Sequence, residues 1–269
     1  MSLVVTLRIA EGVVIAADSL ATIPAEMVIA ADIATVCPKC NEKIQLRDLP
    51  LPPVSVAAST SPFAQKVFPF QRWFGVATFG SGILNGKTIY HHVREAEMAT
   101  SARCDTVTDA AEHLGARLHE ELKTQLGDLS KAPQGAYTVG LHVVGYDGAD
   151  PKTKVVQVGR EVSIEEKAGL GCTVSGQREV VRQLWELGKS DPRQQARYPA
   201  MSLQDAIDYA KFLIRTTADY QRFANMIPTV GGEIDIGFIT PYQEFTWIQQ
   251  KHLTRILEER RYPSHVKPQ

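Results

Sequence analysis

The chain has 269 residues, 44% of them apolar and 22% charged, so it can bury one substantial core. The 29 Lys and Arg and the 30 Asp and Glu leave a formal net charge of −1, which provides no positive surface for nucleic acid or anionic lipid. No basic segment precedes an apolar run at the start, and no stretch of about eighteen apolar residues lacks charges. Four cysteines are too few for a disulfide framework. We therefore expect a cytoplasmic protein that binds neither nucleic acid nor membrane.

The first two predicted elements form a hairpin. Residues 2–9 and 13–18 are rich in β-branched and aliphatic side chains, and Ala10-Glu11-Gly12 separates them. Regular periodicity is then lost, and prolines interrupt the pattern, so we expect no regular strand pairing there. We interpret the segment at about 23–63 as an insertion into one domain that spans residues 1–269.

The rest of the chain alternates groups of strands with pairs of helices. Strands are expected at 66–70, 73–78, 136–146, 154–158, near 162, 233–240 and 245–248, and helices at about 80–100, 106–126, 177–187 and 203–223, followed by a C-terminal helix and tail at about 249–269. Ser202 is the expected N-cap of the fourth helix. This order favours two packed sheets covered by helices over a doubly wound fold.

The N-terminus carries the strongest candidate for chemistry. Removal of Met1 would leave Ser2 as the first residue, with a hydroxyl and a free α-amine. An α-amine has a pKa of about 7.7–8, so near neutral pH it can accept the proton of the hydroxyl. A three-residue turn would place Val4 opposite Asp18 and Ser2 diagonally from Asp18, where hydroxyl and carboxylate can share one lysine. The alternative is that Ser2 starts a surface strand and Asp18 ends a buried one.

Several short segments resemble one known family. Residues 12–19, Gly-Val-Val-Ile-Ala-Ala-Asp-Ser, are similar to the first hairpin of proteasome β-type subunits and their bacterial homologues. Lys66-Val67-Phe68 resembles the strand that carries the family's catalytic lysine, and Gly80 lies at the family's spacing after it. Residues 231–240, Gly-Gly-Glu-Ile-Asp-Ile-Gly-Phe-Ile-Thr, resemble the late core strand with its preceding Gly-Gly.

The resemblance implies an α+β fold, a four-layer αββα sandwich of the N-terminal nucleophile hydrolase type. It implies a peptidase whose identical subunits assemble into rings of six or seven, stacked around a chamber. The implied substrate is a peptide or an unfolded protein, and an ATP-dependent unfoldase is a possible partner. No cofactor and no metal are implied.

The family's roles carry over to single positions. Ser2 would attack the scissile carbonyl, its amine would act as general base, and Lys66, paired with Asp18, would assist proton movement. The Gly80 N–H would stabilise the oxyanion, and Ser175 matches a serine that supports the amine of the nucleophile. Two further residues, Thr22 and Thr78, would contact the substrate, Thr22 together with Gly80 through backbone pairing and Thr78 in the side-chain pocket.

The chain also departs from the family. The nucleophile is Ser instead of Thr, and the segment between Asp18 and Lys66 is longer. Ile227 and Val230 stand where the family has an aspartate and a serine, so the supporting network needs a replacement from Asp219, Asn225 or Thr229. A ring-forming subunit that has lost activity is therefore an alternative.

Two other signals compete with this interpretation. Residues 81–88, Ser-Gly-Ile-Leu-Asn-Gly-Lys-Thr, nearly match a P-loop but have Ser81 where the first glycine belongs, so nucleotide binding is a second alternative. Cys37-Pro38-Lys39-Cys40 is half of a zinc knuckle, and no other Cys or His has the matching spacing. We expect no metal there.

Overall fold

The computed structural model describes residues 2–27, 34–36, 39–40, 43–45, 54–99, 103–131 and 137–251. The chain divides into two units, one formed by Met1–Ala21 with Pro62–Gln269 and the other by Thr22–Ser61. The small unit contains two strand pairs, β3 (Ala21–Met27) with β6 (Val54–Ser61) and β4 (Ala34–Val36) with β5 (Lys43–Gln45). The loss of periodicity there had predicted no regular pairing, which is wrong for these strands.

The large unit is built on two antiparallel sheets. The first, in the order β14-β1-β2-β15-β16, consists of β14 (Gly171–Gly176), β1 (Leu3–Arg8), β2 (Val13–Asp18), β15 (Ile234–Thr240) and β16 (Gln243–Gln249). The second, in the order β13-β12-β11-β8-β7, consists of β13 (Val162–Lys167), β12 (Asp150–Gly159), β11 (Tyr137–Asp147), β8 (Phe74–Gly80) and β7 (Val67–Phe70).

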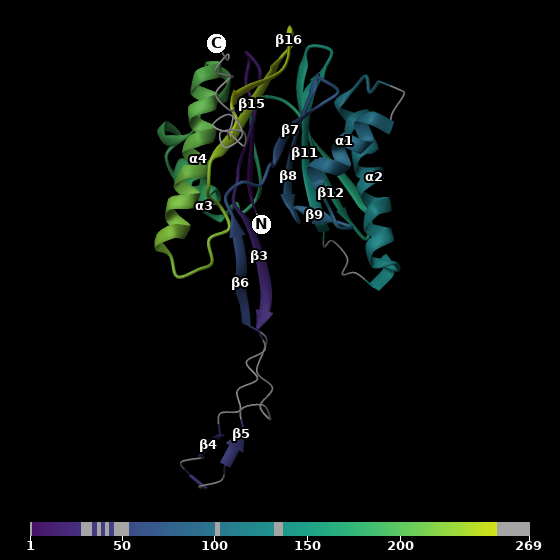
Figure 1. Cartoon of the computed structure of the whole chain (residues 1–269). Coiled ribbons are helices and arrows are strands. Elements are labelled where there is room, and N and C mark those ends of the chain that lie inside the picture. The colour runs from purple at the N-terminus through teal and green to yellow at the C-terminus, as the bar shows by residue number, and fades with distance from the viewer. Residues whose placement is uncertain are drawn as a thin grey trace, which may run out of the picture. The chain divides into compact units, whose positions relative to one another are not determined.

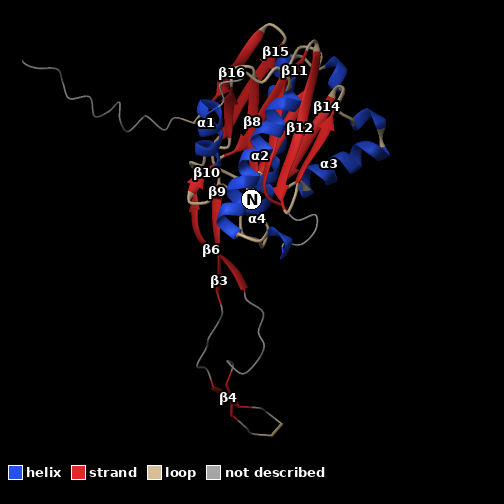
Figure 2. Ribbon diagram, turned by 90° about the vertical axis from the view of Figure 1, so that its right-hand side faces the viewer, coloured by secondary structure: helices blue, strands red, loops and turns tan. Residues whose placement is uncertain are grey.

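Two pairs of helices cover these sheets (Figures 1 and 2). They are α1 (Ile89–Ala99) and α2 (Val107–Leu126) on the second sheet, and α3 (Glu179–Ser190) and α4 (Leu203–Phe223) on the first. Capping boxes start α2 at Thr106 and α4 at Ser202, as expected for the latter. The mixed α+β class with antiparallel sheets is confirmed.

Three buried apolar clusters hold the large unit together. One joins α1 and α2 to the second sheet through residues such as Leu114 and Leu141, and another joins α4 to the first sheet through Ile214 and Val5. The third lies between the two sheets and includes Val4 from β1 and Phe79 from β8. Each cluster buries the apolar face that the periodicity of its strands and helices predicts.

The first hairpin differs from the predicted one by one residue. Its loop has four residues, closed by a hydrogen bond from Ile9 N to Gly12 O, so Arg8 pairs with Val13 and Val4 lies opposite Ala17. The predicted pairing of Val4 with Asp18 is therefore wrong, since a shift of one position moves a side chain to the other face of a strand.

The near P-loop is a small hairpin instead of a strand-to-helix loop. Strands β9 (Ile83–Leu84) and β10 (Lys87–Thr88) pair across Asn85-Gly86, whose φ angles of 47° and 74° are typical of a tight hairpin turn. The predicted helix start at Gly80 is wrong, because α1 begins only at Ile89. The geometry excludes a phosphate-binding loop at this place.

Two predictions involve residues outside the described ranges. Cys37 of the half zinc knuckle is one of them. The predicted C-terminal helix and tail, at about 249–269, lie outside the described residues from 252 onward, and β16 extends to Gln249. Among the helices of the described ranges, none combines the length and the apolar character needed to cross a bilayer.

Candidate active site around Ser2, Asp18 and Lys66

Ser2 immediately precedes the first residue of β1, and 4% of its surface is exposed. Strand alternation puts Ser2 on the same face as Val4 and Thr6, and both of these side chains lie between the two sheets. The Ser2 carbonyl accepts a hydrogen bond of 2.8 Å from Gln177 N. Because Met1 precedes Ser2, its nitrogen is an amide in this chain and not yet an amine.

The Asp18 carboxylate gathers three backbone donors at the same end of the sheet. Oδ1 accepts from Leu3 N at 3.0 Å, and Oδ2 accepts from Leu20 N and Gly231 N, each at 3.1 Å. Asp18 is fully buried. These donors come from three segments of the chain and hold the carboxylate in place. One of them, Leu3, directly follows Ser2.

Lys66 reaches this carboxylate from the second sheet. Its Nζ lies 3.0 Å from Asp18 Oδ2 and donates to Leu20 O at 2.6 Å. The predicted partnership of Lys66 with Asp18 is thus present in the structure, although Asp18 stands opposite Leu3. No hydrogen bond joins Ser2 to Lys66 within the described part of the chain.

Burial shifts both members of this pair toward their neutral forms. Loss of hydration lowers the pKa of Lys66, opposed by the charge and hydrogen bond of Asp18. Loss of hydration also raises the pKa of Asp18, opposed mainly by the charge of Lys66. A lysine with a lowered pKa can exchange a proton nearer to neutral pH than an exposed lysine.

Ser175 lies next to β1 but is held by a histidine that the sequence did not single out. Val4 pairs with Ser175, and the Ser175 Oγ lies 2.8 Å from Nε2 of His142. The other ring nitrogen of His142 lies 2.7 Å from Thr6 Oγ1. Desolvation lowers the pKa of His142 to about 3, so the ring is neutral at physiological pH. It therefore links the two sheets without carrying a charge.

The backbone of Ser2 leaves no room for a side chain at Gly176. It has a φ of 87°, and a Cβ placed there would lie 1.8 Å from the Ser2 carbonyl oxygen. The same Cβ would lie 3.6 Å from Phe79 Cβ, so the end of β8 lies close to this junction between Gly176 and Ser2. Only glycine fits at this junction.

The remaining predicted residues occupy different surroundings. Gly80 ends β8 with a φ of 86° and pairs with Val139. Thr78 N donates to Lys66 O at 2.9 Å, and the buried Thr78 Oγ1 lacks a hydrogen-bond partner in the described structure. Thr22 belongs to the small unit. Of the predicted residues, the structure thus joins Lys66 to Asp18 by an ion pair and to Thr78 by a backbone hydrogen bond.

A second buried ion pair lies beside the first and was missed by the sequence analysis. Lys251 pairs with Asp235, and its Nζ also lies 3.2 Å from Ser19 Oγ. All three residues are buried, and Lys251 and Asp235 both influence the pKa of Lys66, the former lowering and the latter raising it. A lone lysine after a predicted strand gives no signal, because its partner is distant in sequence.

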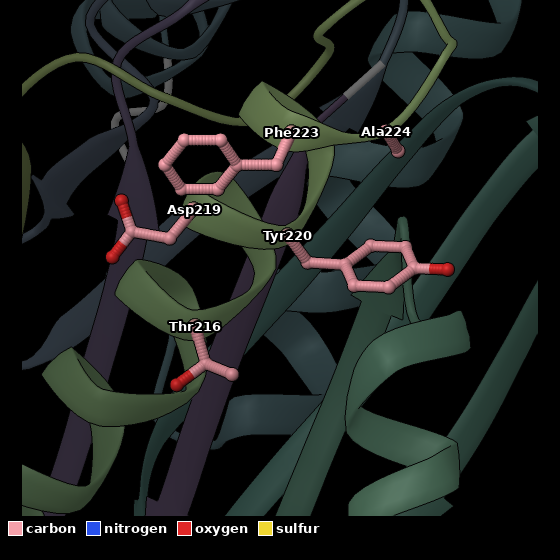
Figure 3. Close-up of a pocket in the computed structure, with 5 residues that line it drawn as sticks. All are labelled: Thr216, Asp219, Tyr220, Phe223 and Ala224. Carbon is pink, nitrogen blue, oxygen red and sulfur yellow. The ribbon is translucent and has the colours of Figure 1, made fainter.

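None of the three predicted replacements reaches the site. Asp219 and Asn225 are exposed, and the side chain of Thr229 contacts Gln221. Asp219 instead lines an open hollow of about 530 Å³ on α4, with Thr216, Tyr220, Phe223 and Ala224 (Figure 3). This hollow has none of the predicted catalytic residues.

The comparisons with known proteins identify the fold only. No family model matches the chain, and no curated protein matches it. Among solved structures, the chain is similar to the helical assembly of the Anbu complex from Pseudomonas aeruginosa. The TM-score is 0.56 at 13% identity, and the match covers 96% of this chain and 91% of the other. The shared feature is therefore the fold across nearly the whole chain.

This finding corrects the family assignment. The chain was identified as similar to proteasome β-type subunits, but no family model supports that membership. The likeness found is to a chain of the Anbu complex, and at 13% identity it shows a shared fold alone.

Proposed function

We propose that the protein is an N-terminal nucleophile hydrolase that cleaves peptide bonds with Ser2 once Met1 has been removed. The buried Lys66–Asp18 pair carries the proposal, because Asp18 binds the backbone of the residue adjoining Ser2 and burial lowers the pKa of Lys66. The succession of helices, sheet, sheet and helices agrees with the αββα sandwich of that class, and the Anbu complex is proteasome-like.

The chemistry follows from the residues at the end of β1. The Ser2 α-amine accepts the Oγ proton as Oγ attacks the scissile carbonyl. Lys66, paired with Asp18, assists the transfer of the Oγ proton to the α-amine, and the Gly80 N–H donates to the oxyanion. Collapse of the tetrahedral intermediate breaks the C–N bond, and the leaving amine takes the proton from the α-ammonium. Water then hydrolyses the ester on Ser2.

The protein is also proposed to work as an oligomer. The solved structure that it resembles is a helical assembly, and residues on α4 present large apolar side chains to solvent, with Phe223 81% exposed. A closed ring and an open helix are both possible arrangements of one head-to-tail contact. Substrates would be peptides or unfolded segments, and an unfoldase partner remains part of the proposal.

Two measurements test the proposed reaction. Intact mass of the purified protein should show loss of Met1, and a fluorogenic peptide should be cleaved by the wild type. Ser2→Ala should abolish cleavage, while Ser2→Thr retains it. Ser190→Ala, an exposed serine at the end of α3, is the matched control and should cleave like the wild type.

The opposite results favour the inactive alternative. Complete retention of Met1 would remove the free amine that the mechanism needs. Equal turnover by Ser2→Ala and the wild type would show that any hydrolysis comes from another site. Either result overturns the proposal and leaves an assembly subunit without peptidase activity.

A further inference from the structure

The second candidate site lies on the helices that cover the second sheet. His92 and Glu95 lie one turn apart on α1, and Glu121 faces them from α2. One ligand atom from each residue lies within 4.8 Å of the others. Figure 1 shows these two helices side by side, and none of the three residues belongs to the site at Ser2.

The His92 imidazole is oriented as a metal ligand would be. The ring is fully buried, and Nε2 lies 2.8 Å from the Leu84 carbonyl oxygen. A carbonyl only accepts, so Nε2 donates to it, and Nδ1 is the ring nitrogen left to bind a metal ion. Nδ1 has no hydrogen-bond partner among the described residues, and it faces Glu121 Oε1 at 4.0 Å. A backbone carbonyl behind the ring is the usual support of a ligating histidine.

Both carboxylates already lie against positively charged or hydrogen-bond-donating groups. The hydrogen bond from Lys87 contributes most to lowering the pKa of Glu95 to about 2, and His91 adds to it. The hydrogen bond from Asn85 contributes most to lowering the pKa of Glu121. The three side chains therefore offer one imidazole nitrogen and two carboxylates within 4.8 Å of one another.

A guanidinium now occupies the space between the carboxylates. Arg117 Nη2 lies 3.2 Å from Glu95 Oε2 and 2.7 Å from Glu121 Oε1. The Arg117 side chain is 40% exposed, so it can turn into solvent when another cation takes its place. Lys87 Nζ pairs at 2.7 Å with Oε1 of Glu95, whereas Arg117 contacts Oε2, so Lys87 can remain in place.

We propose that His92, Glu95 and Glu121 bind a divalent transition-metal ion of the zinc type, which displaces Arg117 from between the two carboxylates. One imidazole nitrogen with two carboxylate oxygens suits Zn²⁺ better than Mg²⁺, which prefers oxygen ligands alone. Water completes the coordination. The ion cross-links α1 and α2, so its role is structural and does not depend on the reaction at Ser2.

Calorimetric titration of the full chain with Zn²⁺ and, separately, Mg²⁺ tests this site. We expect one Zn²⁺ per chain and at least tenfold weaker Mg²⁺ binding. Glu121→Gln should weaken Zn²⁺ binding at least tenfold, while Glu120→Gln, a neighbouring exposed glutamate paired with Lys123, should not change it. Arg117→Gln should bind Zn²⁺ more tightly, because no guanidinium competes for the carboxylates.

A spectroscopic measurement tests the site even if a variant binds less metal only because part of it is unfolded. Co²⁺ bound to the wild type should give the visible absorption of a low-coordinate nitrogen and oxygen site, and Glu95→Gln should change that spectrum. The proposal is overturned if Glu121→Gln and Glu120→Gln bind Zn²⁺ equally. It is also overturned if Arg117→Gln binds Zn²⁺ no more tightly than the wild type.

Discussion

His142 Nε2 lies 2.8 Å from Ser175 Oγ, across the interior between the two sheets. The second ring nitrogen is engaged by Thr6, so one neutral imidazole connects β11 with β14 and β1. A charged ring would have to lose its hydration in this interior. The structure therefore favours the neutral form and makes folding depend on pH.

The first prediction concerns acid stability. The pKa of His142 is about 3 in the folded state and 6.5 in the unfolded state, so the unfolded chain binds the extra proton between these values. The contribution of neutral His142 to the free energy of unfolding is complete above about pH 6.5. It is lost as the pH falls toward 3, at up to about 1.4 kcal/mol per pH unit. Urea unfolding between pH 7 and pH 4 should show this slope.

The matched variant is His142→Gln, which has hydrogen-bonding groups but does not titrate. Its free energy of unfolding should fall less steeply over the same pH range than that of the wild type. Parallel slopes for the two proteins would mean that other groups cause the acid sensitivity.

The second prediction separates a steric clash from backbone strain. Gly176 and Gly148 both have positive φ, but only a Cβ at Gly176 meets another atom, the Ser2 carbonyl oxygen. Gly148→Ala should cost about 1 kcal/mol, the usual penalty of a left-handed conformation. Gly176→Ala should cost more, and it should also reduce peptide hydrolysis because Ser2 must move. Thermal unfolding and the peptide assay measure both, and equal effects of the two variants would contradict the close approach.

Part of this arrangement was readable from the sequence because its signals are local. The capping residue Ser202 lies directly before α4, and the run of β-branched and aliphatic residues at 13–18 identified β2. The hairpin register was not readable, because a loop of three or four residues fits the same letters around Gly12. A single position in that loop decides which residue faces Asp18.

Long-range partnerships were harder to predict. Lys66 was placed with Asp18 through a family resemblance that the comparisons do not support at the family level, yet the ion pair is present. His142 and Lys251 gave no pattern at all. Their partners, Ser175 and Asp235, come from other strands, and only the packing of the two sheets brings these groups together.

The third prediction concerns the second buried ion pair. Lys251→Met leaves Asp235 buried without its cation, and loss of one partner of a buried pair costs about 3–5 kcal/mol. Lys251→Met with Asp235→Leu removes both charges and should be more stable than the single variant. Urea unfolding of the wild type, the single variants and the double variant gives the coupling energy. Simple additivity would show that the two side chains do not interact.

A further variant of this second ion pair, Asp235→Asn, should shift the pKa of Lys66 in a defined direction. The positive charge of Lys251 lowers the pKa of Lys66, and the negative charge of Asp235 raises it. Asp235→Asn should therefore move the pH profile of kcat/KM toward lower pH if Lys66 titrates in that profile. A profile that shifts upward would contradict this electrostatic coupling.

The last prediction asks whether Lys66 acts as a charge or as a proton carrier. Arginine at this position keeps a permanent positive charge for Asp18 but does not give up a proton. Because burial lowers the pKa of Lys66, proton exchange is available to the lysine. We therefore expect Lys66→Arg to stay folded with nearly the stability of the wild type, and to lose about 10²–10⁴ in kcat, the usual range for a general acid or base. Lys66→Met should lose both activity and stability, since Asp18 is then buried without a cation. Peptide hydrolysis and urea unfolding of the two variants decide the point: activity of Lys66→Arg within tenfold of the wild type would mean that the positive charge alone is what the reaction requires.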